Sequence, residues 1–214
     1  MMPKFSFAYE ETNQSFGISE DIQIMQSFED YNCHQHEWIS ILVPFRNREQ
    51  HLPRFIDGIT KHLHINGQRN YEILLIEQVD TFQFNRAKLL NVGAKMARLN
   101  YQAKCLAMEN LCLIPHDIDM IPLMPSLQYD CINSPKLLAT AAQQFGFRMP
   151  YDQYFGGVIA LTWSQFESVN GFSNKYWGWG GEDDDIWQRI GHVGLEIYKE
   201  NSTLGRFQVS EIVF

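Results

Sequence analysis

The sequence predicts an α/β fold with a mainly parallel sheet, because strand-length apolar runs alternate with helix-patterned segments. The apolar runs span residues 39–45, 71–76 and 111–114, and each is short enough for a buried strand. Between them lie two segments, 52–63 and 85–99, whose apolar residues recur at helical spacing. This order of elements is typical of a parallel sheet, and such sheets bind ligands beyond the carboxyl ends of their strands.

The first strand and the first helix have the clearest patterns. The run 39–45 is rich in β-branched residues, and Pro44 stands near its end. One face of the following helix is predicted to carry Leu52, Phe55, Ile56, Ile59 and Leu63. Gly67 follows as a helix stop. In the second helix, the predicted apolar face consists of Leu89, Val92, Met96 and Leu99.

The second half of the chain is rich in aromatic residues and glycine. Ser164 and Glu167 predict a capping box for a short helix, and Gly171 is predicted to end it. A further helix is predicted to run from the acidic residues at 182–185 to His192. Residues 1–37 are polar and irregular, and no linker divides residues 38–214. We therefore expect an irregular N-terminal segment and a single domain over 38–214.

Composition excludes several classes of protein. The 214 residues include 17 lysines and arginines against 25 aspartates and glutamates, for a net charge of −8, so no general basic footprint for nucleic acid is present. No run approaches the roughly 18 to 20 apolar residues of a membrane span. The first residues, MMPKFSFAYEETNQ, lack the apolar core of a signal peptide. The cysteines Cys33, Cys105, Cys112 and Cys131 show no CxxC zinc pattern.

The segment HDIDMIP at 116–122 places two carboxylates two residues apart, directly after an apolar strand. On an extended chain Asp117 and Asp119 would point the same way. Mg²⁺ or Mn²⁺ bound to phosphate usually takes only one or two protein carboxylates. The pattern therefore suits a metal–diphosphate site, and the alternative is a pair of solvated acids in a turn. His116 beside them is interpreted as a packing residue rather than a ligand.

Two aromatic–arginine corners stand at predicted helix starts. Phe45 precedes Arg46 and Arg48, and Phe84 precedes Arg86. Guanidinium groups match phosphate oxygens, and an aromatic ring offers a flat face for a nucleobase. Together with the paired aspartates, these corners favour a nucleoside diphosphate site over solvated helix starts.

The stretch YWGWGGEDDD at 176–185 is the most specific in the chain. Tryptophans interleaved with glycines suit a loop that closes an aromatic lid over a ligand. Acids at a helix N-terminus complement the helix dipole, but the run is longer than capping requires. One of these carboxylates is therefore a candidate general base acting on a hydroxyl nucleophile.

These motifs resemble those of the β-1,4-galactosyltransferases. The matching segments are ILVPFRNR at 41–48, FNRAKLLNVG at 84–93, DIDMIP at 117–122, residues 145–157, and NGFSNKYWGWGGEDDDI at 170–186. They agree in order and spacing across about residues 38–206. The resemblance implies a GT-A type, Rossmann-like fold with a mixed, mainly parallel central sheet. It also implies an inverting transfer of galactose from UDP-galactose to an acceptor sugar.

The resemblance assigns donor-binding residues by position. They are Pro44, Phe45, Arg46, Asn47, Arg48, Phe84, Asn85, Arg86, Asp117, Ile118, Asp119, Tyr154, Gly157, Trp179 and Glu182. Asp119 corresponds to the manganese ligand, so the implied cofactor is Mn²⁺. Tyr154 falls where the family selects its donor, and a tyrosine there goes with galactose.

The resemblance also assigns the acceptor side. The acceptor-binding residues are Phe145, Tyr151, Trp179, Gly181, Asp183 and Asp184. Asp183 corresponds to the catalytic base. The implied acceptor is terminal GlcNAc, joined by a β-1,4 linkage. The alternatives are xylose on a proteoglycan linker, which His116 suggests, and a truncated domain that binds UDP or sugar and turns over weakly.

The remaining implications concern the cysteines and the chain ends. Cys112 and Cys131 flank the paired aspartates at the family's spacing for a disulfide, which implies an oxidising compartment, the Golgi lumen. The family completes its manganese site with a methionine and a histidine shortly after a Gly-Arg pair. Here Gly205 and Arg206 are followed by FQVSEIVF. We therefore expect a domain that lacks both the membrane anchor and the C-terminal metal ligands.

Overall fold

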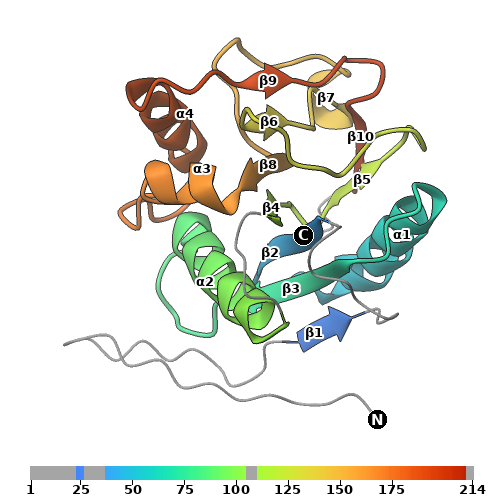
Figure 1. The fold of residues 1–214 in the computed structure, drawn as a ribbon, viewed down its shortest axis with the longest axis horizontal. Helices are drawn as coiled ribbons and strands as arrows, with labels where there is room; N and C mark the ends of the chain where they lie inside the picture. Colours follow the sequence, from blue (N-terminus) through green and yellow to red (C-terminus); the bar gives the residue numbers. More distant parts are fainter. Residues whose placement is uncertain (1–22, 27–36, 105–109, 211–214) are drawn as a thin grey trace.

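The computed structural model describes residues 23–26, 37–104 and 110–210, and its centre is a seven-stranded sheet (Figure 1). In spatial order its strands are β1 (Gln23–Gln26), β3 (Tyr71–Glu77), β2 (Trp38–Phe45), β4 (Leu111–Pro115), β8 (Ile159–Thr162), β6 (Lys136–Leu137) and β9 (Tyr198–Lys199). The two longest ladders, β2 with β3 and β2 with β4, are parallel. The predicted mixed, mainly parallel sheet is therefore confirmed.

A smaller three-stranded sheet lies beside the central one. It consists of β5 (Met120–Pro122), β10 (Arg206–Val209) and β7 (Ala141–Ala142), with β10 in the middle. Strand β10 pairs antiparallel with β5 and parallel with β7. It therefore brings the last described part of the chain alongside the segment that follows the paired aspartates.

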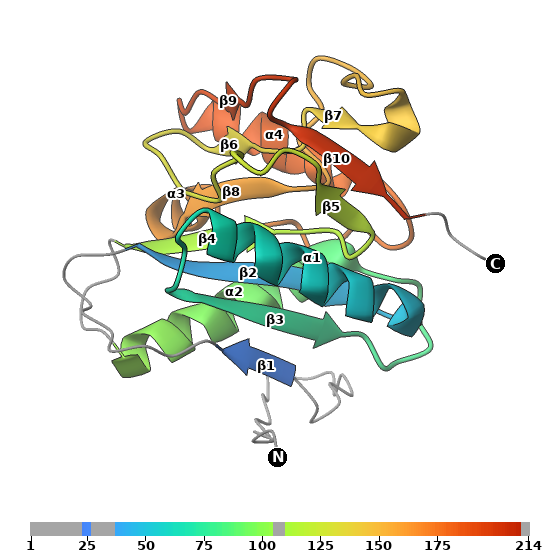
Figure 2. The ribbon, with the colours of Figure 1, turned by 90° about the vertical axis from the view of Figure 1, so that its right-hand side faces the viewer.

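Helices cover both faces of the central sheet (Figure 2). Helix α1 (Leu52–Ile65) lies on one face, and α2 (Arg86–Lys104), α3 (Trp163–Ser168) and α4 (Glu182–His192) pack on the other. Successive side chains of a strand point to opposite faces. Accordingly, Ile39 and Ile41 of β2 join the core under α1, whereas Trp38 and Leu42 join the core under α2. A strand buried on both faces reads as a nearly continuous apolar run. Strand β2 does so except at Ser40, whose hydroxyl donates to Oε1 of Glu72 at 2.7 Å.

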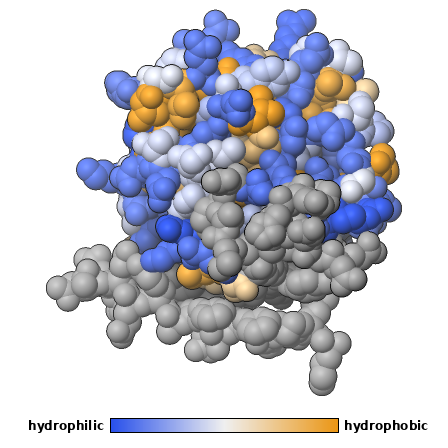
Figure 3. Space-filling model, viewed as in Figure 1, coloured by the Kyte–Doolittle hydropathy of each residue, from blue (hydrophilic) through white to orange (hydrophobic). Residues whose placement is uncertain are grey.

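The described helices are all too short or too polar to cross a membrane. On the face shown in Figure 3, the coloured surface is mostly hydrophilic, with small, separate hydrophobic patches.

Helix α2 is longer than predicted, and its predicted apolar face is confirmed only in part. It spans Arg86–Lys104, and its predicted face residue Leu99 is 51% exposed. The buried side carries Leu89 of the predicted face together with Leu90, Ala94, Ala97 and Tyr101. A β-carbon at Gly93 would lie 2.7 Å from Cδ1 of Ile76 in β3. Because the helix approaches the sheet this closely, small residues share the contact with Leu89, Val92 and Met96 of the predicted face. The prediction is therefore wrong only at Leu99.

The capping box of α3 also differs from the prediction. Oγ1 of Thr162 accepts a hydrogen bond from the amide of Gln165, and the Gln165 side chain accepts one from the amide of Thr162. Ser164 lies inside the helix, so the predicted box of Ser164 and Glu167 is wrong. The physical reason is that β8 continues through Thr162 and the helix begins directly after it.

The N-terminal segment contains at least one regular element. Residues Gln23–Gln26 form β1, which pairs antiparallel with β3. A strand therefore lies within the stretch 1–37, where the sequence predicts no regular structure. Cys33 and Cys105 lie outside the described residues.

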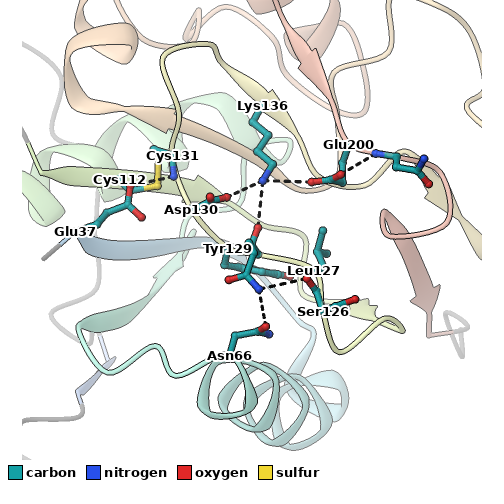
Figure 4. A network of polar contacts seen from close by, with 12 residues as sticks. Glu37, Asn66, Cys112, Ser126, Leu127, Tyr129, Asp130, Cys131, Lys136 and Glu200 are labelled. Atoms are coloured by element: carbon teal, nitrogen blue, oxygen red, sulfur yellow. Dashed lines mark hydrogen bonds and ion pairs between the residues drawn. A yellow bond between two sulfur atoms is a disulfide. The ribbon is translucent and has the colours of Figure 1, made fainter.

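The predicted disulfide between Cys112 and Cys131 is present (Figure 4). It joins β4 to the segment that leads into β6. Oε1 of Glu37 accepts a hydrogen bond of 3.0 Å from the amide of Cys131, and burial raises the pKa of this carboxyl to about 7. Farther along, the buried ammonium of Lys136 lies 2.6 Å from Oδ1 of Asp130 and 3.3 Å from Oε2 of Glu200. These contacts fix the connection between the two halves of the sheet.

The close packing of α2 on β3 predicts a large cost for any side chain at position 93. We expect Gly93→Ala to lower the free energy of unfolding by about 1 to 3 kcal/mol, because the new β-carbon overpacks the buried Ile76 side chain. Urea denaturation followed by circular dichroism measures this change.

A matched control is Gly191→Ala in α4, where a β-carbon has no neighbour within 4 Å. Alanine there should leave stability unchanged or raise it by up to about 1 kcal/mol. Equal effects of the two substitutions would show that Gly93 is not a steric contact point.

Candidate active site

The strands β2, β3 and β4 end at one edge of the sheet, and the predicted site residues begin there. Phe45 at the end of β2 lies opposite Glu77 at the end of β3, and Leu42 lies opposite Pro115 at the end of β4. Arg46 and Arg48 follow β2, and Asp117 follows β4. Ligands of parallel sheets bind beyond this kind of edge, so the topology gathers these side chains where a ligand is expected.

Arg86, the first residue of α2, connects two parts of the site. Nε and Nη2 both lie 2.8 Å from Oδ1 of Asp117, and Nη1 lies 3.5 Å from Oε1 of Glu182. Burial opposes the charge of Arg86, but the two carboxylates outweigh that effect and raise its pKa. One guanidinium thus ties the end of β4 to the start of α4.

The paired aspartates lie in a turn rather than on an extended strand. The amide of Met120 donates to the carbonyl of Asp117 at 3.2 Å, and the amide of Asp117 donates to the carbonyl of Gly157 at 3.1 Å. The carboxyl of Asp119 has its pKa raised to about 6, mainly by burial and then by the charge of Asp117. The amide of Ser210, just after β10, donates to the carbonyl of Asp119 at 2.8 Å. The predicted extended geometry is therefore wrong, although the two acids remain electrostatic neighbours.

The acidic run forms the first turn of α4, as predicted. Gly181 precedes it with φ of +93°, a conformation that suits glycine. Burial is the main cause that raises the pKa of both Glu182 and Asp183, while Arg86 acts in the opposite direction on each. The run therefore contains two carboxyls that hold protons more tightly than exposed acids do.

Asp183 packs against the backbone of the segment before β8. A β-carbon at Gly156 would lie only 2.7 Å from Oδ2 of Asp183. The second carboxylate oxygen, Oδ1, accepts a hydrogen bond of 3.1 Å from the amide of Asp184. The carboxylate of Asp183 is held between the start of α4 and Gly156.

Aromatic side chains line the neighbouring segment. The rings of Phe145 and Tyr151 lie edge-on to the ring of Tyr154, with centroids 5.9 and 5.7 Å away. The Tyr151 hydroxyl donates to Oδ1 of Asp184 at 2.9 Å. The predicted acceptor residues Phe145, Tyr151 and Asp184 therefore meet around the predicted donor-selecting Tyr154.

The two aromatic–arginine corners differ in what they expose. Phe45 is 4% exposed and packs in the core under α1, so its ring face is closed to a nucleobase. Ile118, at 7% exposure, packs in the same core. The guanidinium of Arg46 lies 5.3 Å from the ring centroid of the half-buried Phe84 and donates to the carbonyl of Phe82 at 2.7 Å. The interpretation of Phe45 as a stacking platform is wrong, because the apolar face of β2 continues through it.

The other predicted donor residues occupy the same edge. Pro44 is buried at the end of β2, and Asn47 follows with φ of +52°. Gly157, with φ of +74°, supplies the carbonyl that binds the amide of Asp117. Trp179, another member of the predicted set, is completely exposed.

The loop that carries Trp179 is fastened to α2 at its base. Asn91 donates to the carbonyl of Phe172 at 2.7 Å and to Oδ1 of Asn174 at 2.8 Å, and it accepts from the amide of Phe172 at 2.9 Å. Asn85 donates to the carbonyl of Asn174 at 2.8 Å. We call these contacts of Asn85 and Asn91 with residues 172–174 the loop clamp.

Beyond the loop clamp the contacts become fewer. The amide of Gly178 donates to the carbonyl of Phe84 at 2.8 Å, and the ring of Trp177 meets that of Phe82 at 6.0 Å. Gly180 has φ of +91°, and a β-carbon added there would have no neighbour within 4 Å. The base of the loop is thus fixed, while the Trp179 side chain extends from its glycine-rich tip.

Two family models match adjoining parts of the chain. The model described as the N-terminal region of glycosyl transferase group 7 matches residues 4–132, and the one described as the N-terminal domain of galactosyltransferase matches residues 136–211. β-1,4-Galactosyltransferase 1 of Mus musculus is 41% identical over 175 residues, which cover 82% of this chain and 42% of the mouse protein. The chain belongs to the β-1,4-galactosyltransferase family.

Other members of the β-1,4-galactosyltransferase family agree. β-1,4-Galactosyltransferase 6 of Rattus norvegicus is 35% identical over 200 residues, covering 94% of this chain and 50% of the rat protein. The chain therefore spans about half the length of the curated relatives it matches.

Solved structures give the same fold. A mutant Drosophila β-1,4-galactosyltransferase 7, in complex with manganese, UDP-Gal and xylobiose, matches with a TM-score of 0.69 and 30% identity, over 82% of this chain and 71% of that one. A Pyrobaculum calidifontis mannosyltransferase matches over 83% of this chain and 58% of that one, with a TM-score of 0.52 and 12% identity, and supports the GT-A fold alone. The predicted fold and family are both confirmed.

The sequence patterns missed three residues that position the site of this β-1,4-galactosyltransferase family member. Asn91 and Gly156 fix neighbouring groups, as described above. Gln78 accepts from the amide of Asn85 at 2.8 Å and donates to the carbonyl of Gln83 at 2.9 Å. An asparagine inside a helix and a buried glutamine after a strand are weak signals, because their partners are distant in sequence or lie in loops.

The loop clamp predicts that Asn91 controls the order of the Trp179 loop. Asn91→Ala removes three hydrogen bonds, at about 1 kcal/mol each. We expect faster cleavage within residues 173–181 by a protease under native conditions, together with a stability loss of about 1 to 3 kcal/mol.

The control is Gln102→Ala, an exposed position on the same helix, which should change neither quantity. If Asn91→Ala lowers global stability but leaves the cleavage rate at 173–181 unchanged, the loop clamp does not hold the loop.

Proposed function

We propose that this chain transfers galactose from UDP-galactose to a hydroxyl of an acceptor sugar, with inversion at the anomeric carbon. The observation that carries the proposal is the bridge through Arg86. It joins Asp117, on the predicted donor side, to Glu182, beside the predicted base Asp183. The residues predicted to bind the donor and those predicted to act on the acceptor thus belong to one contact network.

The donor side is suited to a nucleoside diphosphate. Arg46 and Arg48 follow β2 at the ligand-binding edge of the sheet, and arginine matches phosphate oxygens well. Helix α2 begins at Arg86, and its N-terminal dipole also favours an anion. Phe84, with Arg46 over its ring, is the aromatic group at this edge for the uracil base.

Asp183 is the proposed general base. Its carboxylate takes the proton of the acceptor hydroxyl as that oxygen attacks the anomeric carbon. The bond between that carbon and the UDP oxygen breaks on the opposite face, so the configuration inverts and UDP leaves as an anion. Burial raises the pKa of Asp183, which makes it a better proton acceptor than an exposed aspartate.

Asp119 is the proposed ligand for a divalent cation such as Mn²⁺. Its carboxylate is a hard oxygen donor, whereas Oδ1 of Asp117 is already taken by Arg86. Such ions commonly bind through one or two carboxylates together with substrate phosphates and water, so these residues fit the ion. When bound, the ion would offset charge on the departing diphosphate. The amide of Ser210, just after β10, donates to the carbonyl of Asp119. Residues 206–210 contain no histidine or methionine that could serve as a further ligand.

Terminal GlcNAc is the proposed acceptor, joined in a β-1,4 linkage. The aromatic residues Phe145, Tyr151 and Tyr154 offer ring surface beside Asp183 and Asp184, and sugars stack their apolar faces on such rings. Xylose is the second candidate, because the Drosophila relative was solved with xylobiose. The third candidate is a domain that binds UDP or sugar with weak turnover.

The proposed compartment is the Golgi lumen. Support comes from the family and from the disulfide between Cys112 and Cys131, because disulfides persist in oxidising compartments.

The first test concerns the base. Asp183→Asn should lower UDP-galactose turnover by about 10²- to 10⁴-fold, the usual contribution of a general base, while UDP binding stays intact. Release of UDP measures turnover, with GlcNAc and xylose compared as acceptors, and calorimetry measures UDP binding.

The control lies in the same run. Asp185 pairs with Arg189 at 2.8 Å, so Asp185→Asn should affect stability rather than turnover. If wild type binds UDP but neither acceptor is galactosylated, the transferase proposal fails and the binding-domain reading stands.

The second test concerns the cation. Mn²⁺ should bind more tightly in the presence of UDP than in its absence, since the diphosphate supplies oxygen ligands that the protein does not. Asp119→Asn should weaken Mn²⁺ binding in both conditions and remove any metal dependence of turnover. Calorimetry with Mn²⁺ and UDP, together or separately, measures both effects; Mn²⁺ binding that is insensitive to Asp119→Asn would place the ion elsewhere.

A further inference from the structure

We propose that Asn201 is a site of N-linked glycosylation. The glycan donor is an oligosaccharide carried on a lipid diphosphate. The chain reads Asn201-Ser202-Thr203, which is the N-x-Ser/Thr acceptor pattern. Motif matches of this length are common by chance, so the proposal depends on where the structure places these residues.

The acceptor pattern forms an exposed turn between β9 and β10. Asn201, Ser202 and Thr203 are all exposed, and the connection runs along the upper edge of the molecule in Figures 1 and 2. N-linked glycans are bulky and belong on surfaces of this kind. A modifying enzyme can reach the turn without disturbing the core.

The side chain of Asn201 leaves its amide nitrogen open. Oδ1 accepts a hydrogen bond of 2.8 Å from the amide of Thr203. Among the hydrogen bonds of the described residues, none engages Nδ2 of Asn201 or the hydroxyl of Thr203. The atom that would carry the sugar and the hydroxyl two residues later are therefore both accessible.

The backbone holds the turn in place. The amide of Asn201 donates to Oε1 of Glu200 at 2.8 Å. The carbonyl of Asn201 accepts from the amide of Gly205 at 2.7 Å. Glu200 is itself paired with the buried Lys136. A glycan on Asn201 would thus extend from a fixed point of the surface.

The chemistry forms one bond and breaks one. Nδ2 of Asn201 loses a proton and bonds to the anomeric carbon of the lipid-linked oligosaccharide. The bond between that carbon and the diphosphate oxygen breaks, and the lipid diphosphate leaves. This transfer takes place in the lumen of the secretory pathway, and the disulfide between Cys112 and Cys131 marks this chain as one that folds in an oxidising compartment.

A glycan at Asn201 would lie away from the proposed cation ligand Asp119. Strand β10 begins at Arg206, after the turn, and the amide of Ser210 beyond its far end bonds the carbonyl of Asp119. Four strand residues span about 13 Å at about 3.3 Å each. The glycan therefore belongs to the rim of the molecule, and the proposal does not depend on the proposed transferase activity.

The test uses the 214-residue chain expressed behind a secretory leader in animal cells. Material from the lumen or the medium is treated with an N-glycan amidase, and the peptide containing residue 201 is analysed by mass spectrometry. We expect a mobility shift that the amidase removes and conversion of Asn201 to aspartate.

Matched variants distinguish glycosylation of Asn201 from other causes of a mobility shift. Thr203→Ala destroys the acceptor pattern and should abolish the modification, whereas Ser202→Ala preserves Asn-Ala-Thr and should retain it. A second pattern, Asn13-Gln14-Ser15, lies outside the described residues, so all variants also carry Asn13→Gln. Disulfide-bonded chain from the lumen with an unmodified Asn201 would overturn the proposal, as would a modification that persists in Thr203→Ala.

Discussion

The arrangement of the proposed site depends on the guanidinium of Arg86, whose side chain is only 15% exposed. A charge removed from water is tolerated only when partners compensate for it, and here Asp117 and Glu182 do so. Asp117 follows β4 in the first half of the sheet, and Glu182 begins α4, far later in the chain. The ion pairs therefore fix the distance between the end of a strand and the start of a helix. They also place a positive charge beside Asp183, where it opposes the rise in pKa that burial causes.

Glycine residues, which have no side chain, determine the packing of the same region together with the charges. At Gly156 a β-carbon would meet the Asp183 carboxylate at 2.7 Å, and at Gly157 it would meet Sδ of Met120 at 2.9 Å. The backbone at Gly156 thus lies against Asp183, and the backbone at Gly157 lies against Met120, just after Asp119. The same device brings α2 onto β3 through Gly93. Close-packed interiors do not absorb an extra methyl group without strain, so these glycines determine how precisely the carboxylates are placed.

The sequence patterns predicted the fold well and the site unevenly, for physical reasons. Buried strands such as β2 are nearly continuous apolar runs, and α1 repeats its apolar residues at helical spacing, so both were predicted from local patterns. The packing face of α2 was predicted only in part: Leu89, Val92 and Met96 pack against the core, but Leu99 does not. The full face depends on how closely a helix approaches a sheet, which a list of large apolar residues does not encode. Phe45 was misread because one aromatic residue after a strand suits a ligand or a core equally. Asn91 and Gly156 act through partners that only the folded chain brings near.

Helix α2 explains why these features occur together. Its first turn begins with Arg86, which anchors the ion pairs, and Oδ1 of Asn85 accepts a hydrogen bond of 2.8 Å from the amide of Lys88, which caps the helix. The same Asn85 holds the carbonyl of Asn174, and Asn91 holds Phe172 two turns along. A shift of α2 against β3 would therefore move the start of the helix at Arg86, its ion pairs with Asp117 and Glu182, and the base of the Trp179 loop together. Gly93 sets how closely α2 lies on β3. The geometry of the site therefore depends directly on the packing of the core.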